Sequence, residues 1–296
     1  MLILASKDIY KSFHGLYLPN TYLWTHKFSQ PRLRAININA LLCFVKIDQP
    51  ATPFPASTVV LMRDSPDCGL EVFMVERHNK MGFAAAARVF PGGRVDAADA
   101  SLADGAGNSF QVAAIRETFE ESGILLARAK ESGNLVTPEH LASLQGFRSE
   151  INAGKIKFSD LLNSEKLTLA IDLLIPFAHW ITPVNYPKRY NTHFYVARAA
   201  NDHLGEHDGL ESVDSLWITP SDALLDAERG RGKLEFATRL NLKKLTRWAT
   251  TDDAITAAKS ATIVTVQPVL SRPEKDIVAS IPAEADYDGS TFLLEN

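Results

Sequence analysis

Apolar and polar residues alternate along the chain in patterns typical of strands and helices joined by turn-rich segments. β-Branched and aromatic runs predict strands at residues 57–62, 70–77, 88–90, 177–182, 193–198, 213–218 and 263–269. Helical spacing and capping residues predict helices at residues 109–123, 138–147, 158–163 and 236–248, and another that opens at Pro220. Turn residues join the first two strands, so we expect a hairpin there.

Three glutamates, Glu117, Glu120 and Glu121, lie close together on the predicted helix at 109–123. Positions i, i+3 and i+4 share one helical face, so the three charges repel one another unless a cation lies among them. Mg²⁺ prefers carboxylate oxygens and would relieve this repulsion. The alternative is a solvated acidic face, which is the usual fate of a run of charges. Upstream, Gly92 and Gly93 follow an apolar run and predict a tight turn. A glycine turn followed by an acidic helix suggests a metal ion held against a phosphate group.

Composition narrows the class of protein without identifying it. The chain has 296 residues, 46% of them apolar and 22% charged, which suits one large or two small globular domains. Its net charge of −4 gives no overall basic field for nucleic acid. The two cysteines cannot form a disulfide framework and fit a reducing compartment. No uncharged apolar run reaches the roughly 18 residues of a membrane span.

The first 50 residues differ from the rest because lysine and arginine outnumber aspartate there. Such a bias is typical of a targeting presequence, but an extension outside any domain is the interpretation we favour. Closely spaced prolines then indicate a linker. We therefore predict an extension at 1–55, one domain at 56–270 and a tail at 271–296. The predicted location is cytoplasmic, or mitochondrial if the extension is a presequence; the C-terminus lacks a Ser-Lys-Leu type signal.

Residues 116–124, Arg-Glu-Thr-Phe-Glu-Glu-Ser-Gly-Ile, resemble the second half of the Nudix hydrolase signature. Thr118 departs from the bulky aliphatic residue expected at its position, and Asp99 stands where the signature has glutamate, after five residues from Gly93. Sixteen residues separate Asp99 from Arg116, whereas the signature has seven. The longer loop resembles the coenzyme A diphosphatase-like, peroxisomal-type subfamily, as do the stretches at 88–99, 179–183, 189–194, 207–211 and 217–220.

The resemblance runs from about residue 57 to the tail and leaves out the first 50 residues. It implies an α/β fold, the Nudix α/β/α sandwich around a mixed sheet with a helical insertion after the signature helix. This agrees with the order of elements predicted above.

The resemblance also implies roles for single residues. Glu117, Glu120, Glu121 and the carbonyl of Gly92 would bind Mg²⁺ or Mn²⁺. Arg116 would pair with an acid of the loop, for which Asp99 is the candidate, and so hold the loop against the helix. The general base would be Glu120 or Glu121, because it needs only reach and a suitable pKa.

Residues outside the signature are weaker candidates. Glu211 is a candidate base beyond the helix, although an ordinary loop acid is the more common case. Three arginines flank the expected cleft and match phosphate geometry, with plain surface roles as the alternative: Arg77, Arg88 and Arg94. Four histidines lack the spacing of a zinc site, so we expect them to be structural: His78, His193, His203 and His207.

The function that this resemblance implies is metal-dependent cleavage of a diphosphate. The favoured substrate is coenzyme A or acyl-CoA, which would give 3′,5′-ADP and (acyl)phosphopantetheine. An ADP-ribose or NADH diphosphatase is the alternative substrate class. A catalytically silent module that binds a nucleotide for regulation is the alternative of another kind. The expected partner is a small-molecule diphosphate, with no nucleic acid or membrane, and the sequence leaves the oligomeric state open.

Overall fold

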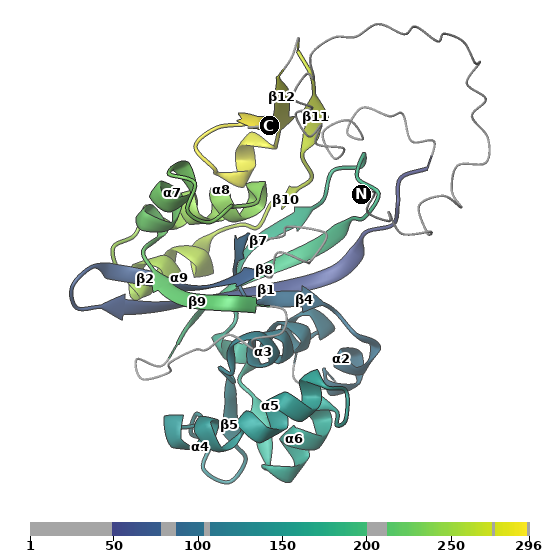
Figure 1. The fold of residues 1–296 in the computed structure, drawn as a ribbon, viewed down its shortest axis with the longest axis vertical. Coiled ribbons are helices and arrows are strands. Elements are labelled where there is room, and N and C mark those ends of the chain that lie inside the picture. The colour runs from purple at the N-terminus through teal and green to yellow at the C-terminus, as the bar shows by residue number, and fades with distance from the viewer. Residues whose placement is uncertain (1–48, 78–86, 104–106, 200–211, 274–275, 295–296) are drawn as a thin grey trace, which may run out of the picture. The chain divides into compact units, whose positions relative to one another are not determined.

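The structure is a computed structural model that describes residues 49–77, 87–103, 107–199, 212–273 and 276–294. Nearly all of the predicted extension lies outside these ranges, as do Glu211 and three of the four histidines, His78, His203 and His207. Within them, a mixed β-sheet lies between two helical layers (Figure 1). No helix of the described ranges has both the length and the apolar character needed to cross a membrane.

The central sheet has the order β10-β7-β8-β1-β2-β3, with β4 paired to β1 and β9 paired to β2. Its strands are β1 (Phe54–Ser65), β2 (Gly69–Arg77), β3 (Arg88–Val89), β4 (Gly92–Arg94), β7 (Ile175–Ile181), β8 (Tyr190–Arg198), β9 (Ser212–Ile218) and β10 (Thr265–Val266). The pairs β1–β8 and β7–β10 are parallel, and the others are antiparallel. The predicted hairpin of β1 and β2 is confirmed.

One face of the sheet is covered by α3 (Ser109–Ser122) and by the helices that flank it in sequence, α2 (Ala97–Leu102), α4 (Pro138–Ser143), α5 (Gln145–Asn152) and α6 (Phe158–Ser164). The short strands β5 (Ala127–Ala129) and β6 (Leu167–Leu169) pair with each other beside them. Side chains alternate along β1, so Val59 and Leu61 join the core under α3 with Phe119. The expected helical insertion after the signature helix is therefore α4 to α6.

The opposite face is covered by α7 (Pro220–Glu228), α8 (Phe236–Leu245) and α9 (Thr251–Ser260). Val60 and Met62 of β1 point into this second core. A separate small sheet follows, made of β11 (Val269–Ser271), β12 (Ile277–Ser280) and β13 (Thr291–Leu294). Tyr287 beside it accepts a hydrogen bond from the Trp180 indole at 2.9 Å. Two helical layers around a mixed sheet confirm the predicted α/β/α sandwich.

Several local predictions were wrong in detail. Asp99 lies in α2 rather than in a loop, and its carboxylate accepts the backbone N–H of Asp96 at 2.7 Å, which closes the first turn of that helix. The glycine pair forms the short strand β4 rather than a free turn, because its backbone pairs with β1. The single helix expected at 138–147 is two helices that meet at Leu144.

Three further segments also differ from the expectation. Residues 167–174, for which no strand is predicted, form β6 and a short 3-10 helix at Ile171–Leu173. The strand expected at 263–269 is only the two-residue β10, and β11 begins where it was to end. Helix α9 was not predicted, because its buried side is made of small residues rather than a bulky apolar stripe. Its Thr250 cap, which accepts the N–H of Asp253 at 3.2 Å, was the signal for it.

Candidate active site

Helix α3 is fixed at both ends by local interactions. Asn108 accepts the backbone N–H of Gln111 at 3.1 Å, and the Gln111 side chain accepts the N–H of Asn108 at 3.2 Å. The helix ends at Gly123, whose φ of 74° is the left-handed conformation that glycine adopts without strain. Thr118 departs from the signature, but its hydroxyl donates to the Ala114 carbonyl at 2.6 Å, so the buried position stays satisfied. The apolar residues of the helix face the sheet.

Arg116 lies at the centre of the site and is only 7% exposed. Its Nε and Nη2 donate to the two carboxylate oxygens of Asp99, each at 2.9 Å, and Nη2 also donates to the carbonyl of Arg94 at 2.9 Å. Its Nη1 donates to Glu117 at 2.9 Å and to Glu120 at 3.1 Å. The predicted pairing of Arg116 with Asp99 is confirmed. It joins α2, α3 and β4 through one guanidinium.

The glycine pair lies directly against the glutamates. The backbone N–H of Gly92 donates to Oε2 of Glu121 at 3.0 Å. A Cβ atom at Gly93 would stand 2.5 Å from the Glu117 carboxyl carbon, and one at Gly92 would collide with the Ser57 carbonyl oxygen of β1. The backbone of β1 therefore requires glycine at position 92, whereas a side chain at position 93 would displace the Glu117 carboxylate. The structure thus brings Gly92, Glu117, Glu120 and Glu121 together, as the sequence predicted.

Burial excludes the solvated acidic face. Glu121 is 5% exposed, and the side chains of Glu117 and Glu120 are 16% and 21% exposed. Burial raises the pKa of Glu120 to about 7, and the nearby charge of Glu117 adds to this, whereas Arg116 opposes it. The site therefore holds more negative charge than Arg116 alone compensates. Three clustered carboxylates with surplus charge are a donor set that fits a hard divalent cation.

The carboxylates of Glu117 and Glu120 are turned toward Arg116 in this structure. Across the part of the chain that the structure describes, no group of three histidine, cysteine, aspartate or glutamate side chains converges as a ready metal site. Glu117 and Glu120 bind Nη1 of Arg116, and Glu121 binds the Gly92 N–H. A cation bound here would thus draw Glu117 and Glu120 partly away from the guanidinium.

The helical insertion supports the last turn of α3. Arg148 Nε and Asn152 Nδ2, both on α5, donate to the backbone carbonyl of Glu120 at 3.0 and 3.1 Å. Carbonyls near a helix C-terminus lack partners within the helix, so this pair satisfies a group that would otherwise need water. Sequence analysis missed both residues, because nothing in their spacing points to a partner so far along the chain.

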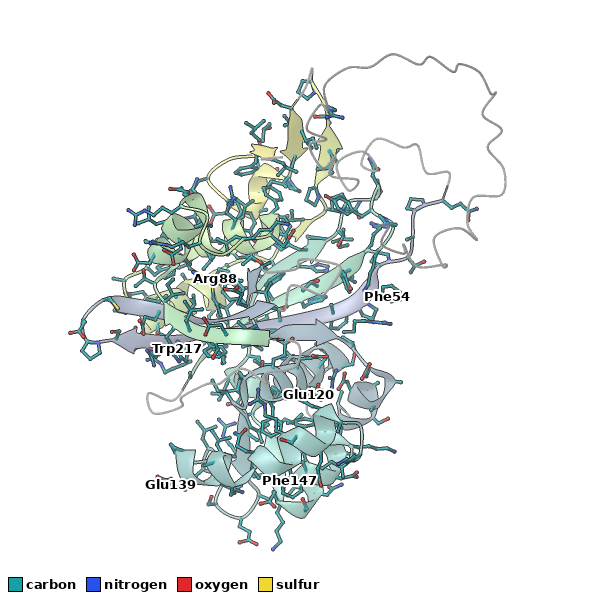
Figure 2. The ribbon with its side chains drawn as sticks, in the orientation of Figure 1. Phe54, Arg88, Glu120, Glu139, Phe147 and Trp217 are labelled. Carbon is teal, nitrogen blue, oxygen red and sulfur yellow. The ribbon has the colours of Figure 1, made fainter. Side chains whose placement is uncertain are left out.

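Of the arginines proposed to meet substrate, Arg88 lies away from the glutamates. Arg88 points into the other helical layer, where its Nη1 donates to Asp226 of α7 at 2.9 Å; Figure 2 shows Arg88 and Glu120 on opposite sides of the sheet. The Arg94 guanidinium stacks over the ring of Phe54, 4.1 Å from its centroid. Arg77 ends β2, where its backbone pairs with β9. Their roles in substrate binding stay predictions.

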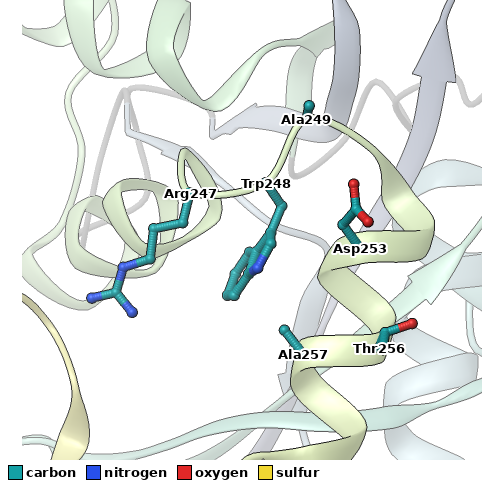
Figure 3. Close-up of a pocket in the computed structure, with 6 residues that line it drawn as sticks. All are labelled: Arg247, Trp248, Ala249, Asp253, Thr256 and Ala257. Atoms are coloured by element: carbon teal, nitrogen blue, oxygen red, sulfur yellow. The ribbon is translucent and has the colours of Figure 1, made fainter.

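A surface hollow lies elsewhere, beside α8 and α9 on the face of the sheet opposite α3 (Figure 3). It is lined by Arg247, Trp248, Ala249, Asp253, Thr256 and Ala257. None of these belongs to the predicted site, and Arg247 is already bound to Asp286 and Asp288. The hollow is therefore separate from the cluster of glutamates.

Comparison with known proteins agrees with this geometry. Residues 105–231, which include all of α3, match the family described as the NUDT19 Nudix domain. A solved Nudix hydrolase from Alicyclobacillus acidocaldarius is 28% identical and superposes with a TM-score of 0.59, over 70% of this chain and 96% of that one. The predicted resemblance to the Nudix hydrolases is thus confirmed, and helix α3 holds the residues that match the Nudix helix.

The chain is also similar to curated proteins that point to one subfamily. It is 32% identical over 160 residues to putative nudix hydrolase 7 of Caenorhabditis elegans, covering 54% of this chain and 50% of the relative. It is 23% identical to the acyl-coenzyme A diphosphatase NUDT19 of Xenopus laevis, over 73% of this chain and 71% of the relative. The human protein of that name is 25% identical, over 59% of each chain. The chain thus spans about half the length of the nematode relative.

Replacing Arg116 by alanine should destabilise the fold by about 3–5 kcal/mol, because it leaves the fully buried Asp99 carboxylate without its partner. Arg128→Ala is the matched control, since Arg128 also forms a two-bond pair with an aspartate, Asp172, but near the surface. That change should cost less than about 1 kcal/mol. Urea unfolding measures both. Equal losses would show that the Arg116 pair has no special structural role.

The raised pKa of Glu120 predicts a pH dependence of stability in metal-free protein. Its pKa is about 7 in the folded chain against an ordinary value of 4.5, so the folded state favours the protonated form. The stabilising contribution is complete below pH 4.5 and is lost as pH rises through 7, a change of about 3 kcal/mol. Unfolding followed in EDTA from pH 4.5 to 8 measures it. Glu120→Gln should flatten the profile in that range. An equally steep profile in this variant would show that the pH dependence of stability does not come from Glu120.

Proposed function

We propose that this Nudix protein is a divalent-metal-dependent hydrolase that cleaves the diphosphate of coenzyme A or acyl-CoA, giving 3′,5′-ADP and (acyl)phosphopantetheine. The observation that carries the proposal is the buried cluster of Glu117, Glu120 and Glu121 packed against the glycine pair of β4. Hydrolases of this family generally use divalent metal ions, which fits such a donor set.

The residues take distinct roles in this proposal. Glu117, Glu120, Glu121 and the carbonyl of Gly92 would hold Mg²⁺ or Mn²⁺. A bound cation neutralises charge on the diphosphate and lowers the pKa of water. Arg116 and Asp99 keep the helix and the glycine strand in register.

Between the two candidate bases, the geometry favours Glu120. Glu121 is tied to the backbone of Gly92 and nearly fully buried, whereas the Glu120 side chain is 21% exposed and its carboxylate accepts a hydrogen bond from Nη1 of Arg116. We therefore propose Glu120 as the residue that accepts the proton of the attacking water.

The choice of substrate rests on the names of three relatives. The Xenopus, chicken and human relatives are called acyl-coenzyme A diphosphatases, at 23%, 27% and 25% identity. Relatives at these identities support cleavage of a diphosphate linkage more firmly than they support an acyl group on the substrate. ADP-ribose and NADH carry the same linkage, so they form the alternative substrate class.

The test is turnover of coenzyme A, acyl-CoA, ADP-ribose and NADH with Mg²⁺, with Mn²⁺ and with EDTA. Metal-dependent release of 3′,5′-ADP from coenzyme A is the expected result. Glu120→Gln should lower kcat by about 100-fold or more, as loss of a general base does. Arg128→Ala, on the exposed ion pair away from the site, should keep full activity.

Other outcomes separate the alternatives. Cleavage of ADP-ribose or NADH alone would retain the chemistry and change the substrate. Binding of these compounds without turnover would favour the silent regulatory module. Full activity of Glu120→Gln would exclude Glu120 as the base.

A further inference from the structure

A row of polar residues crosses the sheet beside the glutamates. Gly93 of β4 pairs with Ser57 of β1, Ser57 pairs with His193 of β8, and His193 pairs with His179 of β7. The row lies on the face covered by α3, because the Phe110 ring of α3 packs 4.3 Å from that of His193. Strand spacing puts His193 about 10 Å from Gly93, two strands away. A moiety attached to a diphosphate at the glutamates would lie within this reach.

His193 is held firmly but has unused hydrogen-bonding capacity. Its ring stacks on that of His179, with centroids 4.2 Å apart, and packs at a tilt against the Phe110 ring, whose centroid is 4.3 Å away. His179 is oriented in turn by Asn191 and by Thr265, whose hydroxyl lies 2.8 Å from Nδ1. Among the described residues, the ring nitrogens of His193 have no hydrogen-bond partner, although the ring is only partly exposed.

The neighbouring position in the row also carries an unpaired polar group. Ser57 is completely buried, and its Oγ has no hydrogen-bond partner in the described structure. The His193 nitrogens, by contrast, are not among the buried unpaired atoms of the described residues, so a ligand can reach them. The accessible member of this pair is therefore the candidate to bind a ligand.

We propose that His193 is a substrate-binding residue that hydrogen-bonds an uncharged polar group, a hydroxyl, amide or heterocyclic nitrogen, of the moiety next to the diphosphate. This inference rests on the proposed function and adds a subsite to it. His179, Asn191 and Thr265 are the positioning residues, because they fix the ring on which His193 stacks. The expectation that His193 is merely structural is replaced by this role.

The charge state of His193 decides which ligand chemistry fits. Burial, together with the neighbouring His179, lowers the pKa of His193 to about 4. The imidazole is therefore neutral near pH 7 and offers one donor and one acceptor. A neutral ring suits an uncharged polar group better than a further phosphate, which would favour a cation.

Two variants separate hydrogen bonding from ring packing. His193→Phe keeps a flat ring between Phe110 and His179 but cannot hydrogen-bond, whereas His193→Gln keeps a donor and an acceptor. We expect His193→Phe to raise KM about 10-fold for coenzyme A with kcat nearly unchanged, and His193→Gln to restore most of the affinity. His140→Phe is the matched control, because His140 pairs with Glu165 in the helical insertion, away from the row. Its KM should equal that of the wild type.

Dephospho-coenzyme A, which lacks the 3′-phosphate, tests the chemistry of the contact. The same increase of KM for both substrates supports an uncharged partner. An increase confined to coenzyme A would mean that His193 binds the phosphate, which would overturn the proposal. An unchanged KM in His193→Phe, or equal increases in the Phe and Gln variants, would overturn it as well. If His193→Phe does not fold, His193→Leu replaces it in the same comparison.

A second readout does not depend on turnover. Coenzyme A should raise the melting temperature of the wild type more than that of His193→Phe at the same concentration. If the wild type cleaves no diphosphate, the proposed function fails, and this shift still tests the subsite. A smaller shift in the variant supports the role of His193, and equal shifts, including none in either protein, overturn it.

Discussion

The site depends on one buried guanidinium. Arg116 has five N–H donors, and the structure uses all five: two bind Asp99, one binds the Arg94 carbonyl, and one each binds Glu117 and Glu120. These partners belong to α2, β4 and α3, so a single side chain sets the distance between the glycine strand and the glutamates. A lysine has one nitrogen and could not span these positions.

The second constraint is the close approach of β4 to α3, and it follows from the hydrogen bonds of Arg116. Once the guanidinium draws β4 onto α3, the Glu117 carboxylate occupies the space that a side chain at position 93 would fill. The backbone of Gly92 is then near enough to donate to Glu121. Three carboxylates are thereby buried together, which raises the pKa of Glu120 and leaves the metal-free protein with an unfavourable negative charge. A bound cation would offset the negative charge that this packing buries.

The sequence was sufficient for the features that local chemistry determines. The Nudix helix, its glutamates and the Arg116–Asp99 pair followed from spacing and from the signature. Features set by contacts distant in sequence were missed: Gly92 and Gly93 form a strand because β1 lies beside them, and Arg148 caps the carbonyl of Glu120 from a helix beyond the signature. Arg88 was expected near the cleft, yet strand alternation turns it toward Asp226 on the other face. His193 carried no sequence signal, because its neighbours come from separate strands and from α3.

The five bonds of Arg116 are not equivalent, and the difference bears on how a cation could enter. Nε and Nη2 hold Asp99 and a backbone carbonyl, which are structural partners. Nη1 alone holds the two carboxylates proposed as ligands. Drawing Glu117 and Glu120 toward a metal would therefore release only Nη1 and leave the clamp on β4 intact. The same residue can thus balance the charge of the carboxylates without a metal and hold β4 in place when a metal binds them, because these two functions lie on different nitrogens.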